Sequence, residues 1–155
     1  MLRFTQNNVI PHNPDEAVDV AEIPLGYEVT AKEEGTDSNK ILVLLKAGQN
    51  IDKNAFVSFL PTDNLATQSA STDKKHVGTA LAAATTGQYF FAVVEGEADA
   101  KCLASAVGDS VVISANVGVG TNTGAATVKN AVYNSAPASG VSKVILSRTA
   151  RVGIA

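Results

Sequence analysis

The chain has 155 residues, a net charge of −3 at neutral pH and a sequence isoelectric point near 5.3. This length fits one domain with a real hydrophobic core and is short for most two-domain enzymes. Charged residues make up 17% of the sequence, below the usual quarter, and there is no basic field for phosphate groups, so we expect no direct binding to nucleic acid. A surface with few charges suits burial against partner proteins.

Residues 1–26 are predicted to form an extended N-terminal arm. This segment holds three of the five prolines and a polar run without periodic partners. Asn13-Pro14-Asp15 has the order of a helix start, so we expect one or two helical turns, although an extended strand fits the apolar positions as well. An arm with little core of its own is expected to contact a neighbouring chain rather than its own β domain, with a frayed terminus as the alternative.

No segment predicts export or membrane insertion. Residues 1–4 are followed at once by polar residues, so the apolar region of a signal peptide is missing, and no run approaches the roughly 20 apolar residues of a membrane span. We therefore expect synthesis in a cytoplasm-like compartment and no membrane partner. The one cysteine, Cys102, cannot form an intrachain disulfide, so packing must supply the stability.

Residues 27–155 are predicted to form a single β domain. Turn signals recur about every 8 to 12 residues, which predicts an all-β sandwich or barrel of short antiparallel strands. The first two strands are expected to pair, and a polar, exposed loop is expected at Ser69–Lys74. Strands are predicted at 27–31, 41–45, 55–60, in the Ala/Val-rich run before Thr85 that contains His76, and at 88–94, 100–104, 111–113, 141–146 and 151–154.

The run Gln88–Val94 is the most apolar window and the expected central strand. Its continuous apolarity predicts that both of its faces are covered. Turns are expected at Glu95–Glu97 and Val107–Ser110 because both contain glycine beside acidic residues. Farther along, 118–124 is expected to be a flexible loop, and 125–133 fits a strand or a helical segment.

Few residues are candidates for chemistry, and we expect no catalytic, cofactor-binding or metal-ligating residue. His76 and Cys102 are the only obvious base and nucleophile, and both are placed in strands where packing is the ordinary role. The other histidine, His12, lies in the arm. The cluster Glu95, Glu97 and Asp99 could at most hold a weak hard cation, and a solvated turn is the more ordinary interpretation.

Glycine and lysine motifs are equally weak. Gly118-x-Gly120 lacks the following helix and third glycine of a dinucleotide site, and no phosphate-loop lysine follows it. Lys74 and Lys75 form a basic pair too small for a nucleic-acid patch. No cofactor is expected.

Three short motifs resemble the decoration, or cement, proteins of tailed-phage capsids. They are His76-Val77-Gly78-Thr79-Ala80, then Thr86-Gly87-Gln88-Tyr89 leading into Phe91-Ala92-Val93-Val94-Glu95-Gly96, and Val107-Gly108-Asp109 before 111–114. The chain end, 144–155, with Val152-Gly153, also fits. The resemblance covers the C-terminal half to two-thirds of the chain.

The resemblance implies a structural virion protein rather than an enzyme. Such a protein is made in the host cytoplasm, binds the major capsid protein on the outside of a phage head, and stabilises the shell. The family commonly seats trimers at three-fold positions, so a homotrimer is implied. The alternative is a small β-barrel ligand-binding module or enzyme, although no convergent set of polar groups favours one.

Overall fold

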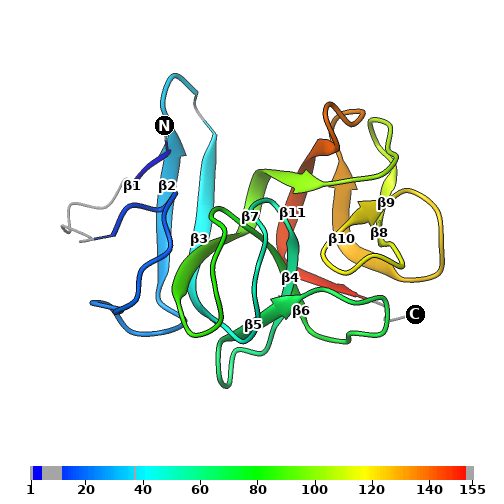
Figure 1. The fold of residues 1–155 in the computed structure, drawn as a ribbon. Coiled ribbons are helices and arrows are strands. Elements are labelled where there is room, and N and C mark those ends of the chain that lie inside the picture. Colours follow the sequence, from blue (N-terminus) through cyan, green and yellow to red (C-terminus); the bar gives the residue numbers. More distant parts are fainter. Residues whose placement is uncertain (1, 5–11, 37, 153–155) are drawn as a thin grey trace.

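The computed structural model describes residues 2–4, 12–36 and 38–152, and this part of the chain contains eleven strands and no helix (Figure 1). The all-β prediction is confirmed. All strands belong to one sheet, in the order β1-β2-β3-β5-β4-β6-β7-β11-β10-β8-β9. The strands are β1 (Leu2–Phe4), β2 (Glu28–Glu33), β3 (Asn39–Ala47), β4 (Phe56–Phe59), β5 (Leu65–Gln68), β6 (His76–Ala80), β7 (Tyr89–Lys101), β8 (Ser110–Ile113), β9 (Gly120–Thr121), β10 (Thr127–Tyr133) and β11 (Val141–Val152).

Five strands close into a ring, here called the first barrel. Strands β3, β5, β4, β6 and β7 are hydrogen-bonded in that order, and β7 returns to pair with β3. The β3–β5 contact is parallel and short, with Lys46 opposite Leu65 and Ala47 opposite Ala66. Side chains such as Leu45, Val57 and Phe90 are buried in its interior. Strand pairing around the ring leaves free backbone groups only where a strand extends past its neighbour.

A second ring, here called the second barrel, shares β7 with the first. Strands β7, β11, β10, β8 and β9 follow one another, and Cys102, directly after β7, bridges back to Gly120 of β9. The turn predicted at Glu95–Glu97 is therefore wrong. Gly96 adopts a φ of 102°, which bends β7 without ending it, and β11 keeps pairing with β7 from Gly96 to Lys101. The bend lets one 13-residue strand serve both barrels.

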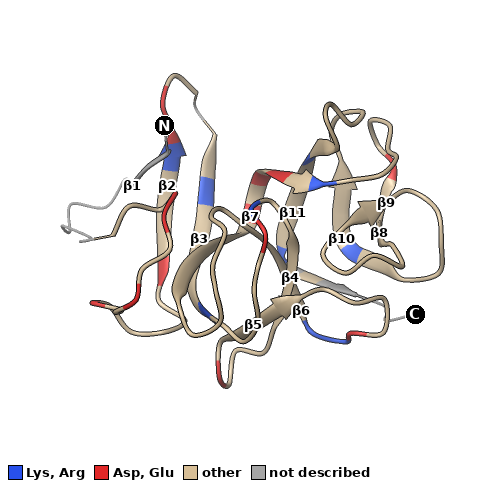
Figure 2. Cartoon of the chain, viewed as in Figure 1, with Lys and Arg blue, Asp and Glu red and all other residues tan. Residues whose placement is uncertain are grey.

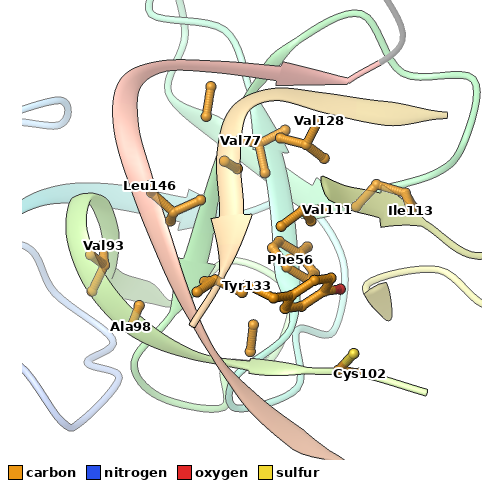
Figure 3. Close-up of a cluster of buried hydrophobic side chains, with 14 of the residues drawn as sticks. Phe56, Val77, Val93, Ala98, Cys102, Val111, Ile113, Val128, Tyr133 and Leu146 are labelled. Carbon is orange, nitrogen blue, oxygen red and sulfur yellow. The ribbon is translucent and has the colours of Figure 1, made fainter. Parts of the chain in front are cut away.

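The two faces of the central strand are both covered, as predicted. Phe90 and Val94 point into the first barrel, whereas Phe91 and Val93 point into a larger core that extends to the second barrel. Figure 3 shows this larger core, where Phe56, Tyr133 and Leu146 lie among aliphatic side chains. Alternate residues of a strand face opposite sides, so a strand buried on both faces must be apolar throughout.

Other details differ from the sequence prediction. Strand β5 was not predicted, and the loop expected at 118–124 contains β9. The segment 125–133 is resolved as a strand, and the two closing strands are one long β11. The loop Ser69–Lys74 is not wholly exposed, because Ser69 is buried with its Oγ 2.7 Å from that of Ser58. The strands are also not all short, or all antiparallel.

The described part of the N-terminal segment lies on its own β domain. Asn13–Glu16 forms a single turn instead of a helix. Val18 exchanges two backbone hydrogen bonds with Tyr89, of 2.9 and 2.8 Å, and Ala17 packs against the interior of the first barrel. The expectation that this segment avoids its own domain is therefore wrong for residues 12–26, because the edge of β7 offers it free hydrogen-bonding groups. Residues 1 and 5–11 lie outside the described part.

Within the described residues, no helix has the length and apolarity needed to cross a membrane.

Candidate functional site

The structure does not bring His76 and Cys102 together. Cys102 is buried in the larger core, where its thiol donates a hydrogen bond to the Ala104 carbonyl oxygen at 3.3 Å. Nearby in this core, burial raises the pKa of the Tyr133 hydroxyl far above its usual range. His76 instead lies at the end of β6, with its ring centroid 5.9 Å from that of Phe59. A base and a nucleophile in different places cannot form a catalytic dyad.

Two members of the acidic cluster of β7, Glu97 and Asp99, have polar side-chain partners. Asn134 donates a hydrogen bond of 2.7 Å to Glu97, and Lys143 lies 2.7 Å from Asp99. The hydrogen bond to Asp99 raises the pKa of the Lys143 ammonium group. Among the described residues, no three His, Cys, Asp or Glu side chains gather as metal ligands. These carboxylates tie β7 to β11 and the loop that precedes it.

The remaining motif residues have structural roles. Gly120 lies against Tyr133 and Phe56, where a side chain would collide with both rings, and Gly118 packs on Gln68 with a φ of 72°. His12 is buried, and its Nε2 accepts a 3.0 Å hydrogen bond from the backbone of Glu22. Lys74 and Lys75 end the loop before β6.

A polar cleft of about 320 Å³ lies beside the bend of β7. Charged side chains of both signs line it, and its buried element is Lys40, whose ammonium group lies 3.1 Å from Glu33. This hydrogen bond lowers the pKa of the Glu33 carboxyl group. Gly96 makes room for the pair, since a Cβ there would meet the backbone and the side-chain stem of Lys40. The buried ammonium group of Lys40 therefore has its counter-charge within the cleft.

A smaller apolar pocket of about 100 Å³ occupies one end of the first barrel, here called the barrel mouth. Val43, Phe59 and Val94, which belong to the barrel interior, form its walls together with Val77. His76 and the ion pair between Glu28 and Arg148 form its polar rim. A pocket with apolar walls and a few polar groups at its edge is the usual form of a recognition site.

Four exposed apolar side chains gather where β2 gives way to β5 along the same edge of β3. This group, here called the β3-edge patch, consists of Leu25, Tyr27, Leu60 and Leu65, each between 37% and 42% exposed. Backbone hydrogen bonds hold the three segments together: Gly26 and Tyr27 bond to Leu44, Lys46 bonds to Asn64, and Asn64 bonds to Leu60.

The β3-edge patch borders the barrel mouth. Tyr27 directly precedes Glu28 of the rim, and Leu60 directly follows Phe59 of the wall. Figure 2 shows that most of the chain consists of uncharged residues, and that acidic residues are frequent in the N-terminal segment and in β2. Exposed apolar groups on neighbouring segments are typical of a protein-binding surface rather than of a catalytic site.

No protein-family model matches the sequence, and no curated protein does either.

The barrel mouth and the β3-edge patch were not identified from the sequence. Their residues come from six separate parts of the chain, between Leu25 and Arg148, and only the closure of the first barrel brings them together. One signal was available: Arg148 follows the apolar run 144–146. An arginine that follows an apolar run in the closing strand indicates a partner for the guanidinium group, although the sequence does not say which one.

Proposed function

We propose that this chain is a structural virion protein that binds the outside of a phage head as a decoration, or cement, protein and stabilises the shell. The β3-edge patch is the observation that carries this proposal. It offers a protein partner four exposed apolar side chains on neighbouring segments, which adjoin residues of the barrel mouth in the sequence. An apolar centre with a polar border is the common anatomy of a protein interface.

The stabilising effect is a matter of linkage. A protein that binds the closed shell better than the opened one adds its binding free energy to the closed state. No reaction is needed for this role, and the structure places His76 and Cys102 apart. The partner is proposed to be the major capsid protein, at the capsid surface of the virion.

The resemblance adds to the proposal because the glycines of its motifs occupy positions where this fold requires close packing or an unusual backbone conformation. Gly78 lets β6 approach the backbone of β7, and Gly96 bends β7 between the barrels. Gly108, with a φ of 87°, turns the chain into β8. The homotrimer rests on the resemblance alone.

The proposal is tested by cosedimentation with phage heads stripped of their decoration protein. Leu60→Lys together with Leu65→Lys places two charges in the β3-edge patch and should weaken binding by tenfold or more, because each ammonium group would lose water at the interface. Val107→Lys is the control, since Val107 is 71% exposed and lies in the turn before β8, outside the β3-edge patch. A wild-type chain that does not bind the heads at all contradicts the proposal.

A further inference from the structure

We infer that the barrel mouth is an anchor pocket that receives one aliphatic side chain from the capsid partner. This inference rests on the proposed function for the identity of the partner, and on the geometry of the first barrel for the pocket itself. The polar cleft beside Lys40 is a weaker candidate because its buried ammonium group already has Glu33 as a partner.

The barrel interior is accessible at the mouth. Most large side chains of the first-barrel core are fully buried, including Leu45, Val57 and Phe90 at 0% exposure. The three interior residues that form the mouth keep a small exposure: Val43 4%, Val94 5% and Phe59 6%. An incoming group would therefore contact the barrel core itself.

The volume selects the kind of occupant. Small-molecule sites usually measure from roughly 300 Å³, and even a single benzene molecule is held by apolar cavities of roughly 150 Å³. The mouth, at about 100 Å³, is smaller than either and matches one branched aliphatic side chain. Its walls of three valines and Phe59 offer dispersion contacts, which favours an uncharged occupant.

The polar rim of the barrel mouth favours a side chain of a polypeptide as the occupant of the pocket. Glu28 and Arg148 are 36% and 53% exposed, so a backbone that passes over the rim could contact their ion pair. The β3-edge patch continues from this rim through Tyr27 and Leu60. A central apolar anchor surrounded by contacts that exclude water is how a few side chains provide most of the binding energy at an interface.

The pocket is tested first with a small probe on the full chain. N-acetyl-leucinamide should shift the methyl resonances of Val43, Val77 and Val94 saturably, whereas N-acetyl-glycinamide should not. Val43→Ile and Val94→Ile each add a methyl group to the pocket, and a variant that keeps the wild-type Tm should lose most of this shift. Val128→Ile makes the same change in the other core and should keep it.

The same variants then separate the inference from the proposed function. A filled variant with wild-type Tm should bind stripped heads at least tenfold more weakly, while Val128→Ile should bind them like the wild type. The inference is overturned by the absence of a saturable valine shift, or by a filled variant that binds heads as tightly as the wild type. A wild-type chain that binds no heads overturns the proposed function and the partner assigned here, even where the leucine probe enters the pocket.

Discussion

Gly78 lies flat against the backbone of the neighbouring strand, so that a methyl carbon on its Cα would stand 2.8 Å from the carbonyl oxygen of Val93. Next to it, Thr79 of β6 is paired with Val93 of β7. The nearest atom belongs to the backbone of the strand that both barrels share, so it cannot move aside as the end of a flexible side chain would. The glycine of the His76–Ala80 motif is therefore required by packing.

Gly78→Ala should lower the free energy of unfolding by about 2 to 3 kcal/mol, because the β6–β7 pairing must shift to admit the methyl group. Urea denaturation measures this. Gly35→Ala is the control: Gly35 has a φ of 83° and open space around it, so only backbone strain of about 1 kcal/mol is expected. Equal losses for the two variants would contradict the close approach of β6 and β7.

Phe90→Asp should destabilise the chain by several kcal/mol, about 3 to 5, because it leaves an unpaired carboxylate inside the closed first barrel. Phe90 is completely buried. Val107→Asp introduces the same charge at a position that is 71% exposed, and its unfolding free energy should stay within about 0.5 kcal/mol of the wild type. A cooperatively folding Phe90→Asp variant of unchanged stability would refute the central place of β7.

Removing the charge of either member of the ion pair in the polar cleft should change the free energy of unfolding by a different amount. Lys40 is only 8% exposed at its side chain, whereas Glu33 is 42% exposed. Glu33→Gln should cost about 1 to 2 kcal/mol, since it leaves a buried ammonium group without its counter-charge. Lys40→Met keeps the packing of the stem and removes the charge, so it should change stability by less than about 1 kcal/mol. Thermal and urea unfolding at neutral pH compare the two variants, and a larger loss for Lys40→Met would contradict this interpretation.

The same pair should contribute to the pH dependence of stability. The hydrogen bond with Lys40 lowers the pKa of Glu33 in the folded chain. A carboxyl group of lowered pKa stabilises the fold above its ordinary pKa, and this contribution is lost as pH falls through the lowered value. Between neutral and acid pH, the wild type should therefore lose more stability than Glu33→Gln. Parallel curves for the two proteins in urea titrations across this range would count against the pair.

Val18→Pro tests the docking of the N-terminal segment. Proline removes the N–H group that Val18 donates to the Tyr89 carbonyl oxygen at 2.9 Å. The amide of Tyr89, which donates to the Val18 carbonyl oxygen, should then exchange its hydrogen at least tenfold faster. Val20→Ala, at an exposed position on the same segment, should leave this exchange rate unchanged. Unchanged exchange in the proline variant would show that residues 12–26 are not held through this bridge.

The sequence predicted those features that depend on local patterns. The apolar run around Phe90 predicted a strand buried on both faces, and the glycine and aspartate before Val111 predicted the turn into β8. Features that depend on ring closure were missed. Strand β5 is four residues long and pairs in parallel with the end of β3, and no local signal marks such a contact.

The bend at Gly96 shows a second limit. Glycine between two glutamates has the composition of a turn, yet here it bends a strand that continues, because β11 supplies hydrogen bonds beyond it. The candidate site was less predictable than the fold. Glu28 and Arg148 are 120 residues apart, and their ion pair depends on the path of β11 past the first barrel.

The most direct test of the proposed function is the temperature at which stripped phage heads release their DNA, measured with and without the purified chain. The chain should raise this temperature in a saturable manner, at a stoichiometry fixed by the capsid lattice, and the Leu60→Lys and Leu65→Lys double variant should raise it much less. An unchanged release temperature at saturating concentrations of the folded wild-type chain would contradict a decoration role.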